Sequence, residues 1–237
     1  MLSDQIKPLL QGVAPEQRGW LSVFLQHQST YRTYQAVENE FFIQRTGSSN
    51  ALMVTSTLRR EGRTSTAVAI ACLSALFQPH KRILLIDADF ENGSLHTLLG
   101  LDVNSSGLAE YFEESNEFSD CIHATNVPGL YLTPVSNRRL ERYRLSSNRF
   151  QSFLNQAQEQ FDLIVVDSSA GSTNNDVTVL ASIIKQVVLV IKYQGVTLPQ
   201  INEFLSNLHR VDTNVLGSVL NQRKFSIPKI FYGAGGG

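Results

Sequence analysis

Six short runs of apolar, often β-branched residues constrain the fold of this chain more than any other feature. Runs of six to eight such residues are typical of strands that are buried on both faces, as the strands of parallel sheets are. They do not alternate with polar residues, which argues against a sheet with one face in water. We expect strands at residues 51–56, 82–89, 130–135, 162–169, 186–193 and 215–221.

Helix-length segments separate most of these runs. We expect helices at 64–77, 94–101, 148–160 and 198–211. In the last segment Ile201, Phe204, Leu205 and Leu208 recur at helical spacing and form one apolar face. Alternation of strands and helices predicts an α/β fold with a mainly parallel, twisted sheet, right-handed crossovers and helices on both faces.

Length and composition indicate how many such domains to expect. With 237 residues, of which 42% are hydrophobic, the chain can bury a full core, and we expect a single domain of the P-loop NTPase-like type at 46–225. Residues 1–45, rich in Gln and aromatic residues, are predicted to form a helical flank. Residues 226–237 end in a glycine-rich stretch and are predicted to be a flexible tail.

Charge and cysteine content exclude several classes of protein. The formal net charge of −1 provides no general attraction to nucleic acid or to an anionic membrane, so we expect no nucleic-acid partner. Cys72 and Cys121 are too far apart in sequence for the paired spacing of metal sites and disulfide frameworks. The chain has no signal-peptide pattern and no apolar run of about 20 residues, so we expect a cytoplasmic protein.

The segment "TSTLRREGRTST", residues 55–66, lies between the first predicted strand and the first predicted helix. A strand, a tight turn and a helix N-terminus in this order direct backbone N–H groups and the helix dipole at a phosphate. Phosphate loops usually end in Gly-Lys followed by Ser or Thr; here Gly62, Arg63 and Thr64 hold those positions, and Ser65 follows. The alternative is an ordinary strand-turn-helix junction with arginines in solvent, and the loop alone does not decide between the two.

Carboxylates follow two of the predicted strands. Asp87 and Asp89 stand at the end of the second strand, and Asp167 stands at the end of a later one. Ligands of open α/β sheets bind at the carboxyl ends of the strands. Because Mg²⁺ prefers oxygen ligands, carboxylates beside a phosphate loop predict a site for a magnesium-bound nucleotide, ATP or ADP.

Four segments together resemble a known family: "VTSTLRREGRTSTAVAIACLSAL", "ILLIDADFENGSLHTLLGL", "FDLIVVDSS" and "NVLGSVLN". They look like the bacterial tyrosine autokinases of capsule and exopolysaccharide production, within the ParA/MinD class of deviant P-loop ATPases. The resemblance implies that Thr64 and Asp87 serve the metal and the chemistry, with Asp89 beside them and Asp167 as the Walker B carboxylate. It also implies that Asn221 lies near the base, although a turn-forming Asn at a strand end is the alternative.

The complete set of expected site residues follows from the motif and the resemblance. The expected catalytic residues are Asp87 and Arg63. The expected nucleotide-binding residues are Gly62, Arg63, Thr64, Ser65 and Asn221. The expected metal ligands are Thr64, Asp87, Asp89 and Asp167.

The loop departs from the family pattern, which typically reads Pro-Gly-Glu-Gly-Lys-Ser-Thr where this chain has "RREGRTS". Arg63 keeps the charge of the usual Lys, but a planar guanidinium does not replace a compact ammonium. Arg60 stands at a Gly position, where the backbone is expected to need a positive φ or to approach the phosphate closely. Since phosphoryl transfer depends on positioned charge, we expect these changes to reduce turnover more than binding.

Two further features of the family are also altered, its tyrosines that accept phosphate in trans and its contact between subunits. Its tails carry a cluster of tyrosines, whereas the tail of this chain has Tyr232 alone. Its Glu-x-x-Arg-x-x-Arg motif, which joins subunits in a ring, becomes Asn39, Phe42 and Arg45 if its end aligns there. Homo-oligomerisation therefore stays an open alternative.

We favour a degenerate, kinase-like protein that regulates exopolysaccharide polymerisation or export by docking to a membrane polysaccharide co-polymerase at its cytoplasmic face. That partner would hold the chain at the inner membrane. An active tyrosine autokinase using ATP and Mg²⁺ is the first alternative. A ParA/MinD-like positioning ATPase is the second, and it is disfavoured because Leu58 and Arg59 stand where that class has an additional Lys. The direction of the Arg63 side chain, toward the phosphate site or away from it, separates the first two hypotheses.

Overall fold

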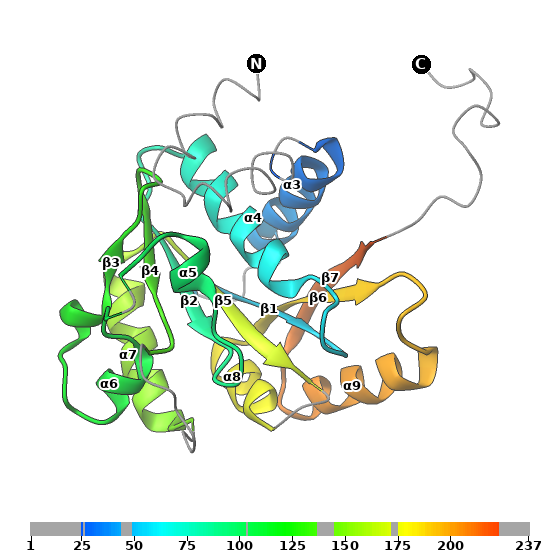
Figure 1. Ribbon diagram of the computed structural model, residues 1–237. Coiled ribbons are helices and arrows are strands. Elements are labelled where there is room, and N and C mark those ends of the chain that lie inside the picture. Colours follow the sequence, from blue (N-terminus) through cyan, green and yellow to red (C-terminus); the bar gives the residue numbers. More distant parts are fainter. Residues whose placement is uncertain are drawn as a thin grey trace.

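The central sheet has seven strands in the described part of the chain, in the order β3-β4-β2-β5-β1-β6-β7 (Figure 1). This computed structural model describes residues 25, 27–43, 49–102, 104–136, 145–171 and 175–222. Every strand pair is parallel except the short β3 with β4. The strands are β1 Ala51–Ser56, β2 Ile83–Ala88, β3 His123–Ala124, β4 Leu130–Thr133, β5 Leu163–Ala170, β6 Gln186–Lys192 and β7 Asn214–Asn221.

Helices cover both faces of this sheet. The described helices are α3 Gln28–Ile43, α4 Arg63–Phe77, α5 Leu95–Leu98, α6 Leu108–Phe112, the 3-10 turn η1 Phe118–Cys121, α7 Ser147–Gln160, α8 Asp176–Ile184 and α9 Leu198–Arg210. Figure 1 shows α3 and α4 on one face and α7, α8 and α9 on the other. The prediction of a mainly parallel α/β sheet in a single domain is confirmed.

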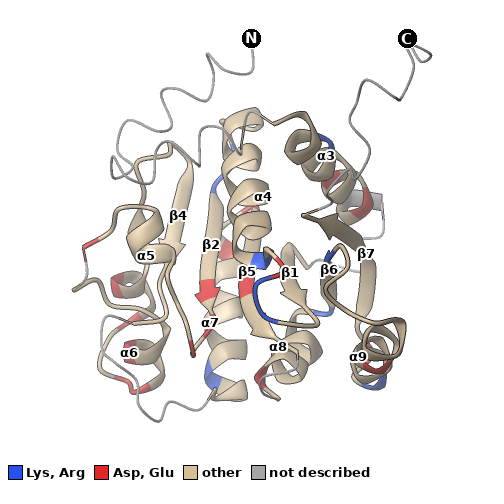
Figure 2. Cartoon of the chain, turned by 45° about the vertical axis from the view of Figure 1, so that its right-hand side comes forward, with Lys and Arg blue, Asp and Glu red and all other residues tan. Residues whose placement is uncertain are grey.

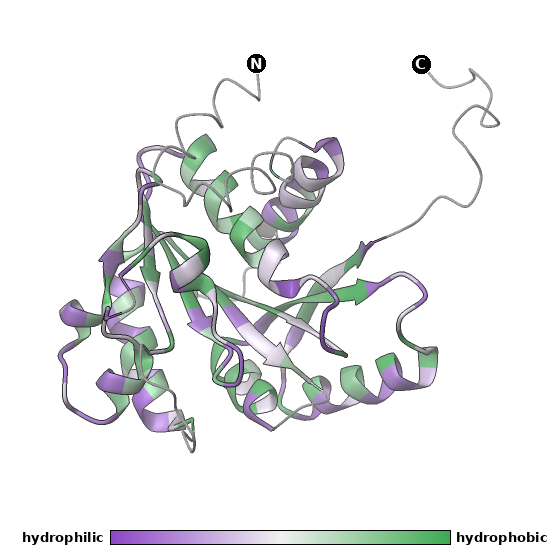
Figure 3. Cartoon of the chain, viewed as in Figure 1, coloured by the Kyte–Doolittle hydropathy of each residue, from purple (hydrophilic) through white to green (hydrophobic). Residues whose placement is uncertain are grey.

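Alternate strand residues build two separate cores, because successive side chains of a strand point to opposite faces. Leu52 and Val54 of β1 join the core under α3, α4 and α5. Ala51 and Met53 of the same strand join the core under α6, α7, α8 and α9. In Figure 3 the strands and α4 are coloured mainly hydrophobic, whereas α3 and α9 also carry hydrophilic positions. This two-sided burial explains why the sequence shows continuous apolar runs.

Most predicted elements lie within one or two residues of their expected positions, apart from a few corrections. The predicted helix 94–101 is the four-residue α5, and the predicted strand 130–135 ends earlier, at Thr133. Four elements were not predicted: α6, η1, β3 and α8. Residues 1–24 of the predicted flank, Arg45 and residues 226–237 with Tyr232 lie outside the described residues. Among the helices of the described part, none has the length and apolar character needed to cross a bilayer.

The parallel arrangement brings the predicted site residues to one edge. Asp87 of β2 pairs in register with Asp167 of β5, and β5 is also the neighbour of β1, from which the loop leaves. Figure 2 shows acidic positions at the ends of β2 and β5 beside the basic loop that precedes α4. The carboxyl edge of the sheet therefore contains both the loop and the carboxylates.

Candidate functional site

The loop between β1 and α4, residues 57–62, has the backbone of a phosphate-binding turn. Gly62 precedes the first residue of α4 with a φ of 94°, and Arg60 has a φ of 61°. The expectation that position 60 needs a positive φ is therefore correct, and an arginine is held in a conformation that costs L-residues energy. No side chain caps the N-terminus of α4, so its first N–H groups are open to an anion.

The carboxylate of Glu61 stabilises this loop by accepting hydrogen bonds from two backbone N–H groups. Glu61 is 1% exposed; its Oε2 accepts the N–H of Leu58 at 2.8 Å, and its Oε1 accepts the N–H of Lys192 at 3.0 Å. It thereby joins the loop to the end of β6. A buried carboxylate with two backbone donors is well satisfied, which gives the loop a fixed shape.

Asn221, at the end of β7, supports the loop from outside. Its Nδ2 donates to the carbonyl oxygen of Glu61 at 2.9 Å. A Cβ added to Gly62 would lie only 1.9 Å from that Nδ2 atom. Gly62 is thus required both by its φ and by the close approach of Asn221. The structure places Asn221 against the loop backbone, and its expected contact with a base stays a prediction.

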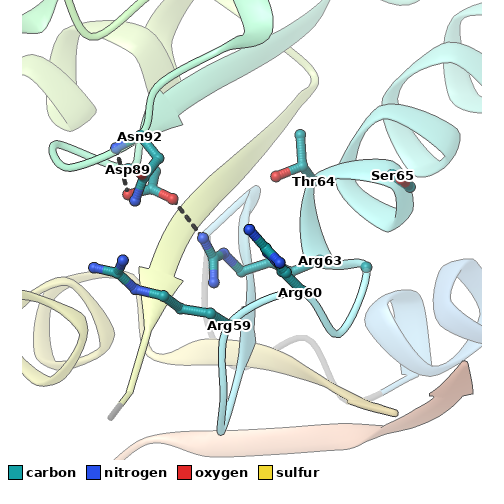
Figure 4. Close-up of a pocket in the computed structure, with 8 residues that line it drawn as sticks. Arg59, Arg60, Arg63, Thr64, Ser65, Asp89 and Asn92 are labelled. Atoms are coloured by element: carbon teal, nitrogen blue, oxygen red, sulfur yellow. Dashed lines mark hydrogen bonds and ion pairs between the residues drawn. The ribbon is translucent and has the colours of Figure 1, made fainter. Parts of the chain in front are cut away.

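The guanidinium of Arg63 points toward the segment that follows β2 and forms an ion pair with Asp89 there (Figure 4). The side chains of Arg63 and Asp89 are only 10% and 5% exposed. The Nη1 atom of Arg63 also lies 3.4 Å from the Oγ of Ser56, whereas its Nε has no hydrogen-bond partner among the described residues. The residue at the lysine position is therefore held by a buried carboxylate from the neighbouring segment.

The two carboxylates at the end of β2 organise the segment that follows them. Asp87 accepts the N–H groups of Asp89 at 3.2 Å and Leu95 at 3.0 Å. The second oxygen of Asp89, Oδ1, accepts the hydroxyl of Ser169 and the N–H groups of Glu91 and Asn92, at 3.2 to 3.3 Å. Burial raises the pKa of Asp87 to about 6, although its backbone donors oppose the shift.

Asp167 lies deeper at the same edge. Burial raises the pKa of Asp167 well above its usual range, and the neighbouring Asp87 raises it further, while a hydrogen bond with the Thr64 side chain lowers it. Its Oδ1 is buried and has no hydrogen-bond partner among the described residues. Thr64 and Asp167 are thus brought together as predicted.

A pocket of about 450 Å³ opens over the loop and the start of α4 (Figure 4). It is lined by Arg59, Arg60, Gly62, Arg63, Thr64, Ser65, Asp89 and Asn92. Arg59 forms an ion pair with Glu91. Asp87, Asp167 and Asn221 do not line this pocket but support the residues that do.

Sequence reasoning missed several contributors to the site. The role of Glu61 is not visible in the sequence, because it depends on the turn of the loop and on the N–H of Lys192 in β6. Asn92 and Ser169 follow Asp89 and Asp167 closely in sequence, so proximity to predicted carboxylates could have found them. The N–H of Lys192 could not be found, because it reaches the loop only through the sheet order.

The residues fit the phosphate part of a nucleotide better than they fit a metal. Open N–H groups, two hydroxyls and arginines surround the pocket, and all suit phosphate oxygens. Every carboxylate oxygen of Asp87 and Asp89 already accepts a hydrogen bond or an ion pair. Within the described residues no group of three or more His, Cys, Asp or Glu side chains is arranged to hold a metal ion. The metal role of Thr64, Asp87, Asp89 and Asp167 stays a prediction.

Comparison with known proteins shows which family and which relatives the chain is similar to. A family model described as "AAA domain" matches residues 60–222, from the loop to the end of β7. The Staphylococcus aureus protein named "Putative tyrosine-protein kinase CapB" is 28% identical over 187 residues, which cover 77% of this chain and 79% of CapB. Other relatives with kinase names are longer, and the chain spans about 25% of their length.

Solved structures share the fold with this chain. The kinase domain of Escherichia coli tyrosine kinase ETK superposes with a TM-score of 0.67 at 22% identity, covering 82% of this chain and 79% of that domain. The Pyrococcus furiosus cell division ATPase MinD superposes with a TM-score of 0.62 at 21% identity, covering 73% and 71%. Since a kinase and a cell division ATPase both have this fold, the fold alone does not decide the activity.

Proposed function

The chain belongs to the AAA domain family, and we propose that within it this chain is a tyrosine-kinase-like P-loop protein with weak or absent nucleotide turnover. It regulates exopolysaccharide polymerisation or export by docking to a membrane polysaccharide co-polymerase. The kinase names of its relatives motivate the pathway. Docking at the cytoplasmic face of the inner membrane, and self-association there, are parts of the same proposal.

The observation that carries this proposal is the buried ion pair between Arg63 and Asp89. Phosphoryl transfer is accelerated mainly by cations fixed against the developing phosphate charge. To act in that way, Arg63 would have to leave Asp89 in a buried position without its partner. Leaving a buried charge unpaired costs several kcal/mol, about 3 to 5 in known cases. The ion pair therefore opposes the catalytic position of the cation.

The internal support of the loop agrees with a docking role. Glu61 and Asn221 hold the loop by hydrogen bonds to its own backbone and to β6. These contacts need no nucleotide. A protein that acts by its shape requires a scaffold held by its own contacts, and these hydrogen bonds support that role.

The first experiment compares ATP binding and turnover in the native chain and in Arg63→Lys. We expect no ATP hydrolysis and no tyrosine autophosphorylation by the native chain. Arg63→Lys should bind Mg-ATP about tenfold more tightly in calorimetry, because a lysine can extend toward phosphate without a planar head. Arg210→Lys, in the last turn of α9, is the matched control and should behave as the native chain does. Steady native turnover equal to that of Arg63→Lys would overturn the proposal.

A second experiment tests docking. A polysaccharide co-polymerase co-expressed with the chain and purified in detergent should retain it. We expect retention to be unchanged in Asp87→Ala, since docking in this proposal does not use the chemistry of the site. Loss of retention in that variant would indicate that the complex depends on a working site.

An active kinase stays the second candidate because of one observation. The Oδ1 atom of Asp167 is buried without a hydrogen-bond partner among the described residues, and Thr64 is bonded to the same carboxylate. An unpaired carboxylate oxygen beside a hydroxyl suits a magnesium ion that brings its own water. The same turnover assay decides between the two candidates.

A further inference from the structure

We propose that residues 225–232 of this chain fold back along β7 as a further, antiparallel strand and close the groove between β7 and α3. The segment reads "FSIPKIFY", and three residues separate it from the end of β7. This pairing would limit the flexible tail expected from the sequence to the glycine-rich end. It uses a different surface from the pocket over the loop, and it holds whether or not the chain turns over nucleotide.

The outer edge of β7 is open to another strand. β7 is the last strand of the described sheet, where β6 alone pairs with it. Between Val215 and Leu220, its backbone forms no hydrogen bond with any described residue outside β6. The strand is eight residues long and contains neither a charged residue nor a proline. Such an edge readily pairs with another strand, and proteins usually cover it or block it with charge.

A groove of about 550 Å³ lies beside this edge, between β7 and its neighbour α3 (Figure 1). Leu220 is 54% exposed, one of two large apolar side chains in the described part that are well exposed. A Cβ added to Gly217 would meet no atom within 4 Å. Further chain in the groove would therefore remove apolar surface from water without a clash at Gly217. The groove is lined by Thr33, Ala36, Val37 and Glu40 of α3, Val188 of β6 and residues 216–220 of β7.

The position and length of the tail make it the occupant. Residues 223–237 follow the described part of the chain, directly after β7. Gln222 has a φ of 56°, a left-handed conformation that is typical of tight turns between antiparallel strands. Residues 222–224 then form a three-residue connection, which is a usual hairpin length. The eight residues 225–232 match the eight residues of β7.

This register places an apolar tail residue against the core. Ile227 stands opposite Val219, which packs against the core under α3 and α4. Because directly opposite residues of an antiparallel pair point to the same face, Ile227 would extend that core. Pro228 suits a strand that becomes the new edge, since proline is tolerated on edge strands and blocks further pairing.

Charge favours the same occupant. Glu40 is the charged residue among those that line the groove. Residues 223–229 contain three basic residues and no acidic one, so the two surfaces attract each other.

The pairing also determines where the tail tyrosine lies. Tyr232 would stand near Asn214, which pairs with Gln186 at the start of β6. That end of the strands is opposite to the carboxyl edge, where the loop lies. A tail held along β7 therefore keeps Tyr232 away from the phosphate site of its own chain.

The first test is hydrogen–deuterium exchange of the full chain, read at the backbone N–H groups of residues 226–231. We expect exchange at least tenfold slower than in a synthetic peptide of residues 223–237. Ile227→Asp places a charge in the apolar groove, so it should return these groups to the rate of the peptide and speed exchange at residues 215–220. Gly235→Asp adds the same charge beyond the paired segment and is the matched control. Peptide-like rates in the native chain would overturn the inference.

A disulfide test identifies the occupant. Val219→Cys combined with Ile227→Cys should form a disulfide within one chain, because directly opposite residues of an antiparallel pair have Cα atoms about 4.5 to 5.5 Å apart. Val219→Cys combined with Gly235→Cys is the control and should form one at least tenfold more slowly. The native Cys72 and Cys121 are buried and are present in both variants.

Three results of the disulfide test would contradict the inference: no disulfide in the first variant, equal rates in the two variants, or a disulfide between two chains. The last of these would assign the groove to the tail of a second copy. None of them bears on the proposed function, which the turnover assay tests separately.

Discussion

Two segments follow β1 and β2 at the carboxyl edge of the sheet, residues 57–62 and 89–94. Both are held in shape by a buried carboxylate, but the residue differs. Each is closed by a carboxylate that is 1% exposed and accepts two backbone N–H groups: Glu61 in the first and Asp87 beside the second. The segment after β2 keeps the sequence pattern that resembles the kinases, whereas the loop after β1 departs from it. The loop after β1 thus keeps the backbone shape of a phosphate loop although its residues differ from the family pattern.

The largest expected effect tests whether Glu61 alone fixes the loop. Glu61→Ala leaves the N–H groups of Leu58 and Lys192 without their acceptor, so the free energy of unfolding should fall by about 3 kcal/mol. Chemical denaturation measures this change. Glu203→Ala, on the exposed face of α9, is the control and should stay within about 0.5 kcal/mol of the native chain. Equal stability of the two variants would mean that the Glu61 contacts do not hold the loop.

A second prediction concerns Gly62, the last residue of the loop after β1. Gly62→Ala places a Cβ at a φ of 94° and 1.9 Å from Nδ2 of Asn221, so it should lower stability by about 2 kcal/mol. It should also displace the Asn221 amide, which would be seen as a shift of its side-chain NMR signals. Gly217→Ala in β7 meets no atom within 4 Å and should leave stability nearly unchanged. A tolerated Gly62→Ala would show that the loop can relax away from β7.

The third and smallest effect concerns Asp87, the carboxylate of the other segment. Burial raises its pKa to about 6, so the folded chain holds this proton more tightly than the unfolded chain does. The stability contributed by protonation is present at low pH and is lost as the pH rises through about 6. Lowering the pH from about 7 to about 5 should therefore stabilise the native chain by about 1 kcal/mol relative to Asp87→Asn. Denaturation curves of both proteins at each pH measure the difference, and parallel pH profiles would contradict it.

Much of the fold could be predicted because its strands are buried on both faces and appear as uninterrupted apolar runs. The missed helix α8 has the same cause. Its segment "DVTVLASII" is apolar and is followed at once by β6, with Lys185 at a φ of 69° making the break. Periodicity cannot separate a buried helix from a buried strand where no glycine or proline marks the boundary. The two-residue β3 is too short to leave a pattern.

In the candidate site, too, some features could be predicted from the sequence and others could not. The positions of Thr64, Asp87 and Asp167 could be predicted, since the ends of parallel strands must meet at one edge. The direction of Arg63 could not, because it depends on Asp89, which lies 26 residues away in the chain. The bond from Glu61 to Lys192 spans 131 residues and requires the sheet order. Local sequence therefore predicts where the functional groups stand, and tertiary pairing determines which of them are neutralised.

Hydrogen bonds also join the end of β7 to the loop. Asn221 donates to Glu61, and the side chain of the next residue, Gln222, donates to the carbonyl oxygen of Arg60 at 3.2 Å. The last two described residues of the chain are therefore both bonded to the backbone of the loop. If a ligand at the loop changed these two hydrogen bonds, thermodynamic reciprocity would require a change at the end of β7 to alter the binding of that ligand by the same free energy.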